Sequence, residues 1–194
     1  MHTDSGAIEM NVRSVFRTTA LAILLLAGTQ AAARTVTDPE RPRQLEGEDP
    51  VSVSWDDPAG FSEIRYSGNR WEAEQGNWVE ELARYIRERA GRALPAGQRI
   101  DIRITDIDRA GDYEPGRGVD GDRIRVVRDI YPPRLSLSFT RYDASGQVIA
   151  QGERRLTDLG YLHRASRRFG NDPLGHEKRL VDDWVNAELR VPGA

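Results

Sequence analysis

The amino-acid sequence predicts an α+β fold: a four- to five-stranded, mostly antiparallel sheet with two amphipathic helices packed on one of its faces. Three observations favour this fold. Several short segments alternate apolar and polar residues with the period of two that β-strands show. Two longer segments carry an apolar stripe at helical spacing. The order of the segments, which is strand, helix, strands and a final helix, is typical of a sheet covered on one side.

The N-terminal residues 1–33 have the features of a secretory signal peptide. Read from Met10, basic residues are followed by an apolar run and then by small residues: Arg13 and Arg17, residues 20–27, and residues 31–33. This order is typical of a signal peptide, and the apolar run is far shorter than the roughly 20 residues that span a bilayer. We therefore expect a periplasmic or secreted protein with no stable membrane anchor.

Cleavage of this segment is expected between Ala33 and Arg34, where Ala31 and Ala33 fit the small-x-small rule, and a cut after Ala31 fits nearly as well. The sequence leaves open whether Met1 or Met10 is the true start. Because the chain contains no cysteine, it has no lipid-modified cysteine and no disulfide bond. The core alone must hold the fold together.

The first part of the mature chain predicts a leader, a strand and an irregular stretch. Residues 34–50 contain three prolines and many charges and are expected to form a flexible leader. A single α+β domain is expected over residues 51–191. It opens with a strand at residues 51–55, where apolar and polar residues alternate. The pattern between residues 61 and 77 is irregular.

One helix and one strand follow. Asn77, with Glu80 three residues on, is expected to be a helix N-cap. Apolar residues then recur at helical spacing as far as residues 90–91: Trp78, Leu82, Tyr85 and Ile86. Residues 98–108 form a strand with isoleucines on one face. Because a helix joins it to the first strand, that pair is expected to be parallel.

The next segment predicts a loop and three strands. A loop rich in glycine and acidic residues covers residues 110–122, and residues 123–127 form a short strand. Residues 135–140 and 148–156 form the clearest hairpin of the chain. Gly146 lies where a bulged loop needs positive φ.

The chain is expected to end in a helix. Asp172 is the expected N-cap, with Pro173 at the first helical position, where a proline costs no hydrogen bond. The apolar stripe that follows consists of Leu174, Val181, Trp184, Val185 and Leu189. This stripe would face the sheet.

The net charge of the chain is −3, and removal of residues 1–33 leaves it unchanged because that segment has two acids and two arginines before Arg34. This balance argues against a general nucleic-acid or anionic-membrane surface. The segment Gly116–Gly121 has the letters GxGxxG, but a proline precedes it and strand-like residues follow. A dinucleotide site needs a helix there, so we interpret the segment as a loop.

A run of acidic residues is the most conspicuous polar feature. Asp106 and Asp108 are expected to share the strand face of the isoleucines, so that two carboxylates end a buried row. With Asp112 and Glu114 they could supply oxygens to Ca²⁺ or Mg²⁺, although their spacing matches no calcium loop. The alternative is that these acids accept backbone N–H bonds and pair with arginines, with no cofactor.

Other candidate residues are isolated. The sequence has no HExxH or GxSxG motif and no cysteine to work with a histidine. His176, near the start of the last helix, is expected to be exposed and could act as a general base, and His163 lies among arginines on the surface. Trp71 and Trp78, with Tyr66, could line a ligand groove or belong to the core.

Several strings together resemble the bacterial domain-of-unknown-function family 3016 over about residues 50–190. They are residues 51–55 with Asp57-Pro58, residues 95–111 with Glu114-Pro115, residues 128–134, residues 153–158, and residues 177–180 with Asp183-Trp184. The resemblance implies an exported protein of proteobacterial type and supplies no catalytic residue or cofactor. It directs attention to residues 105–115 and 128–134, which flank one loop. Asp129 and Arg134 could there join Asp106 and Asp108 in an ion-pair network.

These observations favour a non-catalytic binding or interaction module of the cell envelope, whose partner would be an unidentified envelope protein or ligand. The alternative is a cation-dependent binding protein or hydrolase that uses Asp106, Asp108, Asp112 and Glu114. A third, weaker interpretation is a purely structural surface protein. The sequence favours no enzyme class.

Overall fold

The structure is a computed structural model, and it describes residues 34–47, 50–116, 121–164 and 169–189. The expected signal peptide, residues 1–33, lies outside these residues. Among the residues that are described, no helix is both long enough and apolar enough to cross a membrane.

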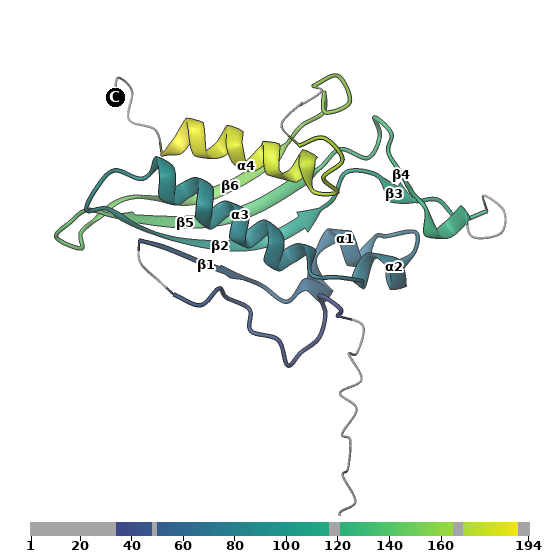
Figure 1. Cartoon of the computed structure of the whole chain (residues 1–194), viewed down its shortest axis with the longest axis horizontal. Coiled ribbons are helices and arrows are strands. Elements are labelled where there is room, and N and C mark those ends of the chain that lie inside the picture. The colour runs from purple at the N-terminus through teal and green to yellow at the C-terminus, as the bar shows by residue number, and fades with distance from the viewer. Residues whose placement is uncertain (1–33, 48–49, 117–120, 165–168, 190–194) are drawn as a thin grey trace, which may run out of the picture. The chain divides into compact units, whose positions relative to one another are not determined.

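The described residues form a four-stranded sheet with the strand order β1-β2-β5-β6 (Figure 1). Its strands are β1 (Val51–Trp55), β2 (Arg99–Asp108), β5 (Arg134–Tyr142) and β6 (Val148–Thr157). β1 and β2 are parallel, and the other pairs are antiparallel. A second, two-stranded sheet consists of β3 (Asp112–Tyr113) and β4 (Arg125–Val126). The predicted α+β fold with a mostly antiparallel sheet is confirmed.

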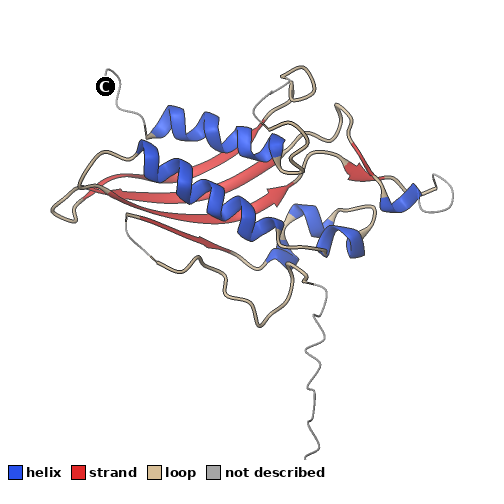
Figure 2. Cartoon of the chain, in the orientation of Figure 1, coloured by secondary structure: helices blue, strands red, loops and turns tan. Residues whose placement is uncertain are grey.

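Two long helices cover one face of the main sheet (Figure 2): α3 (Trp78–Ala93) and α4 (Gly175–Glu188). Each helix buries an apolar stripe, because residues three and four apart share one side of a helix. Leu82 and Ile86 of α3 and Val185 of α4 are fully buried. The ring of Phe139 on β5 meets Trp184 edge to face, with 5.9 Å between their centres. The core lies between these helices and the sheet.

The helix ends differ in detail from the expected ones. Asn77 precedes α3, but its side chain makes no capping hydrogen bond. The last helix begins at Gly175 rather than directly after Asp172. The Asp172 carboxylate accepts the N–H of Leu174 at 2.9 Å and pairs with Lys178 at 2.5 Å. It therefore closes a turn before the helix, and the expected N-cap is wrong by two residues.

The stretch that the sequence leaves irregular folds into short helices. These are a 3₁₀ turn at Pro58–Gly60, α1 (Ser62–Arg65) and α2 (Arg70–Glu74). Another 3₁₀ turn, Gly121–Arg123, precedes β4. Helices of four or five residues complete little more than one turn, so they have no apolar period to recognise.

The leader contacts the domain, where the sequence predicts a flexible segment. Thr35 forms a β-bridge with Gln75, and Gln44 forms one with Ser54 of β1. The N–H of Leu45 donates to the carbonyl of Val53 at 2.9 Å. Leu45 is 8% exposed and Val36 is 7% exposed. Two apolar anchors in a polar segment are therefore enough to place residues 34–47 against the edge strand β1.

Candidate functional site

A β-bulge in β2 decides where the predicted acidic residues lie. Ile104 pairs with Leu137 of β5, but the next paired residue is Asp106, opposite Ser136. The extra residue reverses the alternation of side chains along the strand. Ile107 therefore continues the buried isoleucine face, with no exposed surface. The expectation that Asp106 and Asp108 share that face is wrong.

Each carboxylate of β2 has a partner instead. Asp106 accepts two hydrogen bonds from Ser62 of α1, one from the backbone N–H at 2.6 Å and one from the hydroxyl at 2.7 Å. Asp108 pairs with Arg134 across the strands, with 2.7 Å between oxygen and nitrogen. Asp106 therefore fixes the start of α1, while Asp108 supplies the ion pair that was expected for Arg134.

The two acids beyond β2 are also occupied. Asp112 accepts the backbone N–H groups of Gly68, at 3.2 Å, and of Tyr113, at 2.7 Å. Glu114 pairs with Arg128 at 3.0 Å and accepts the hydroxyl of Tyr131 at 3.3 Å. Within the described ranges, no three Asp, Glu, His or Cys side chains gather as a metal site would require. The metal interpretation stays a prediction, and these contacts do not favour it.

A cavity of about 270 Å³ lies where the two candidate segments meet. We call it the sheet-end cavity. Its lining includes residues from α1, the end of β2, the start of β3 and the segment before β5: Ser62, Glu63, Tyr66, Asp108, Arg109, Asp112, Ile130, Tyr131 and Arg134. The structure therefore brings Asp108, Asp112 and Arg134 together. Asp106 reaches the cavity only through Ser62, and Asp129 is exposed and does not line it.

Two buried glutamates hold the turn beneath this cavity. Glu63 is 4% exposed, forms an ion pair with Arg125 and accepts the backbone N–H of Arg109 at 2.9 Å. Glu177 of α4 is fully buried and accepts the N–H of Ala110 at 2.6 Å. Its other carboxylate oxygen has no hydrogen-bond partner among the described residues. Two acids from two helices thus fix adjacent backbone groups of one turn.

Burial changes the acidity of two carboxyl groups in the site. It raises the pKa of Glu63 above the ordinary value, and the guanidinium groups of Arg125 and Arg109 oppose the shift. Burial also raises the pKa of Asp108, which the ion pair with Arg134 opposes. Perturbed carboxyl groups in a cavity are typical of functional sites, although structural ion pairs produce them too.

A positive-φ glycine keeps the turn close to the small sheet. Gly111 has a φ of 79°, and a Cβ atom there would lie 2.7 Å from the carbonyl oxygen of Val126. Arg125 donates to the carbonyl of Gly111 at 2.7 Å. Its guanidinium also lies over the ring of Tyr113, 4.7 Å from the ring centre. The turn after β2 and the β3–β4 pair therefore form one packed unit.

Apolar side chains are exposed on two segments that reach the cavity, which Tyr66 and Ile130 line. Nine large hydrophobic side chains are exposed in the described parts of the chain, and five of them come from residues 66–71 and 124–130. We call these five the apolar rim: Tyr66, Trp71, Ile124, Val127 and Ile130. The two segments are neighbours, because Arg123 pairs with Glu72 at 2.6 Å and lies over the ring of Trp71.

The remaining candidates have structural roles. Trp78 belongs to the core, and its indole N–H donates to the carbonyl of Ala73 at 3.0 Å. His176 is partly buried rather than exposed, and its ring meets Tyr161 edge to face at 4.8 Å. His163 is exposed. The expected GxGxxG loop lies mostly outside the described residues, because residues 117–120 are not among them.

Sequence reasoning did not single out Glu63 or Glu177 as members of the site. The helical spacing could have indicated that Glu177 is buried. It lies three, four and seven residues before Leu180, Val181 and Trp184, so it shares their buried stripe. No such indication exists for Glu63, because α1 is too short to show a period.

Comparison with known proteins identifies the family and nothing finer. No curated protein matches the chain, and neither does a solved structure. A family described as protein of unknown function, DUF3016, matches residues 49–187, a range that runs from just before β1 almost to the end of α4. The chain therefore belongs to the DUF3016 family, as the motifs of its sequence indicated.

Proposed function

We propose that this protein is an exported, non-catalytic binding module of the bacterial cell envelope, and that it binds a partner protein at the sheet-end cavity and the apolar rim. The observation that carries the proposal is the apolar rim itself. Five of the nine exposed large hydrophobic side chains of the described residues come from two neighbouring segments, and two of the five, Tyr66 and Ile130, line the cavity. Soluble proteins rarely expose apolar side chains together unless the surface has a partner.

The arrangement also has the composition of a protein interface. Tyrosine and isoleucine side chains line a cavity that contains paired charges, Asp108 with Arg134. Aromatic and aliphatic anchors beside satisfied polar groups are typical of interface centres. A small ligand site would instead enclose its apolar lining. The two rim residues that line the cavity, Tyr66 at 69% exposed and Ile130 at 63% exposed, face solvent.

Export is supported by the signal-like order of residues 1–33. The non-catalytic part of the proposal is supported by the state of the candidate groups. The acids of the site already accept hydrogen bonds from backbone groups, Ser62 or arginines. A general acid or base needs a free position toward its substrate, and each of these acids already has at least one oxygen engaged in such a contact.

Site-specific photo-crosslinking in cells tests the proposal. A photoreactive residue in place of Ile130, on the apolar rim, should yield a crosslinked product with a distinct envelope protein. The matched control replaces Val148, which is 52% exposed at the hairpin away from the cavity. Crosslinking at position 130 and not at position 148 supports the proposal. Equal or absent crosslinking at both positions contradicts it.

The cation-dependent alternative has one observation in its favour, because Asp108 and Asp112 line the same cavity. Under our proposal, millimolar Ca²⁺ or Mg²⁺ leaves the melting temperature unchanged, since Asp108 pairs with Arg134 and Asp112 already accepts two backbone N–H groups. A cation that binds only the folded state would raise the melting temperature. A rise that disappears in Asp112→Ala would restore the metal-dependent function and displace ours.

A further inference from the structure

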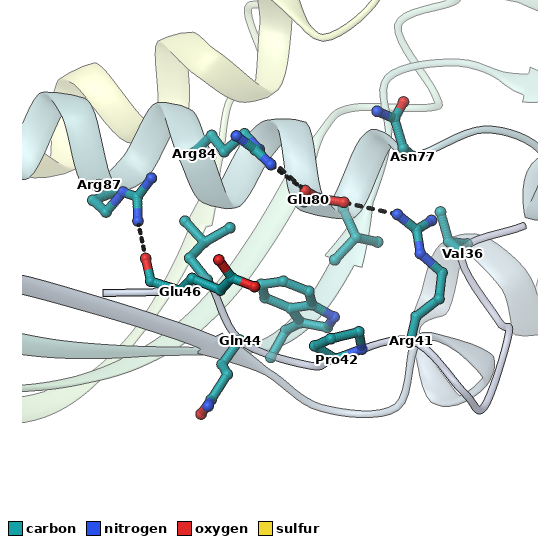
Figure 3. A pocket seen from close by; sticks show the side chains of 12 residues that line it. Val36, Arg41, Pro42, Gln44, Glu46, Asn77, Glu80, Arg84 and Arg87 are labelled. Atoms are coloured by element: carbon teal, nitrogen blue, oxygen red, sulfur yellow. Dashed lines mark hydrogen bonds and ion pairs between the residues drawn. The ribbon is translucent and has the colours of Figure 1, made fainter. Parts of the chain in front are cut away.

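A second cavity lies between the leader and α3 (Figure 3). Its volume is about 370 Å³, within the range of roughly 300–1,000 Å³ that small-ligand sites occupy. We call it the arginine groove, after Arg41 of the leader and Arg84 and Arg87 of α3. Figure 3 shows these three guanidinium groups arranged around one opening.

The groove carries an excess of positive charge. Among the described residues, three arginines line it and two carboxylates do, those of Glu46 and Glu80. Glu80 serves two of the arginines at once: Arg41 reaches one oxygen at 2.7 Å, and Arg84 reaches the other. Arg87 donates to the backbone carbonyl of Glu46 at 2.7 Å and forms no ion pair with a described carboxylate. The protein as a whole is acidic, so this excess is local.

Most of the donor capacity of these arginines remains unused. A guanidinium group has five N–H donors. The hydrogen bonds inside the groove use two donors of Arg84, one of Arg41 and one of Arg87. Donors that converge from two elements fit a bidentate anion, because carboxylate and phosphate oxygens match the planar fork of arginine.

Apolar side chains form the floor between the two walls. Trp55 of β1, Val79 of α3 and Leu45 of the leader all line the cavity and are largely buried. The first turn of α3 also borders it, and the positive end of the helix dipole favours negative charge there. The groove therefore combines cationic walls with an apolar floor.

We propose that the arginine groove is a binding site for a small organic anion: a carboxylate or phosphate monoester with a flat apolar body. The anionic group pairs with Arg84 and Arg87 of α3 at the mouth, where Arg84 is 61% exposed, and Arg41 of the leader donates to it from the facing wall. The apolar body lies against Trp55. This site is separate from the sheet-end cavity, since the two cavities share no lining residue.

The leader forms one whole wall of this site, so binding should also strengthen its docking. Arg41 and Leu45 line the groove from the leader, and α3 supplies the facing wall. A ligand that contacts both walls binds only when the leader is in place. By linkage it must then stabilise the docked leader.

Calorimetric titration of the purified protein with four probes tests the proposal. Phenyl phosphate and benzoate each have an anionic group and a flat apolar body. Inorganic phosphate lacks the apolar body, and benzylamine has the apolar body but a positive charge. We expect saturable binding of phenyl phosphate or benzoate, weaker binding of inorganic phosphate and none of benzylamine. Preference for one of the two aromatic anions identifies the anionic group.

Matched variants locate the binding. Arg84→Gln and Arg87→Gln should each weaken binding of the aromatic anion about tenfold, the usual worth of one charge-assisted hydrogen bond. Arg92→Gln is the control, because Arg92 is an exposed arginine of the same helix, in an ion pair of the same spacing with Glu88, outside the groove. Unfolding curves of each variant without probe check that it folds.

Three results would overturn the proposal. The first is that neither aromatic anion binds saturably at millimolar concentration. The second is that benzylamine binds as tightly as benzoate. The third is that Arg92→Gln weakens binding of the aromatic anion as much as Arg84→Gln does. None of these results bears on the partner protein proposed for the sheet-end cavity. A crosslinked partner at position 130 would likewise leave the groove's ligand untested, so the two proposals fail separately.

Discussion

Glu63 and Glu177 show at the residue scale how a buried charge can specify one conformation. Each accepts a backbone N–H of the turn after β2, at Arg109 and Ala110. Burying a carboxylate is costly unless hydrogen bonds and an opposite charge compensate it. Arg125 supplies that charge to Glu63. The position of the turn therefore depends on these two carboxylates, and we expect substitutions of either glutamate to be poorly tolerated.

Loss of the Glu63 carboxylate should destabilise the protein strongly. In Glu63→Ala, the guanidinium of Arg125 stays largely buried, with 16% of its side chain exposed, and loses the carboxylate of its ion pair. An uncompensated buried charge costs about 3–5 kcal/mol in the free energy of unfolding. Glu88→Ala is the control, because its ion pair with Arg92 is solvent-exposed and contributes at most about 1 kcal/mol. Urea unfolding measures both, and similar losses would contradict the assignment.

His176 should make stability fall below neutral pH. Burial lowers its pKa from the ordinary value of 6.5, and Arg179 acts in the same direction, whereas Glu177 and Asp158 oppose the shift. As the pH falls, His176 therefore takes up a proton near pH 6.5 in the unfolded chain, whereas in the folded protein it stays neutral to a lower pH. Because the unfolded state binds more protons in that window, stability decreases as the pH falls through it.

The difference between wild type and His176→Phe isolates this contribution from that of the acidic groups. Phenylalanine can keep an edge contact with Tyr161 but cannot titrate. Urea unfolding at pH values of about 7.5 and about 5.5 should show a larger loss of stability in the wild type than in the variant. An equal loss in both proteins would remove His176 as the cause.

At the scale of elements, the leader should behave as a docked segment with Leu45 as its anchor. Leu45→Ala removes buried apolar surface and should release residues 34–47, with a cost of about 2 kcal/mol where the segment is docked. Trypsin should then cut at Arg41 and Arg43 faster than in the wild type. Gln44→Ala is the control, because Gln44 is exposed. Equal cleavage rates would show that the leader is flexible, as the sequence predicts.

Periodicity predicted the long elements well, because each repeats its pattern over many residues. The stripe of Leu82 and Ile86 located α3, and the alternation in residues 135–140 located β5. Periodicity did not predict features that depend on a single residue. One extra residue in β2 moved Asp106 to the other face, and no count of apolar residues predicts a bulge. α1 and α2 depend on contacts with distant segments, such as the Asp106 bond to Ser62.

At the scale of the whole molecule, the candidate site was only partly predictable because some of its residues come from elements far apart in the sequence. The two loop segments, residues 105–115 and 128–134, could be expected to meet because they flank one loop. Glu63 and Glu177 come from helices far away in the sequence, and only the packed fold brings them to the turn at Arg109. Buried charge from remote helices therefore has to be found in the structure.

We predict where the mature protein starts from the contacts that residues 34–36 make with the fold. The carbonyl of Arg34 accepts the N–H of Gly76 at 2.7 Å, Thr35 bridges to Gln75, and Val36 is buried. A cut after Val36 would remove all three contacts, whereas the expected cut before Arg34 keeps them. N-terminal sequencing of the exported protein should therefore find Arg34 first, or Ala32 if cleavage follows Ala31. A product that begins beyond Val36 would contradict the predicted cut and the docked leader, and one that retains Leu21–Leu26 would contradict the signal peptide.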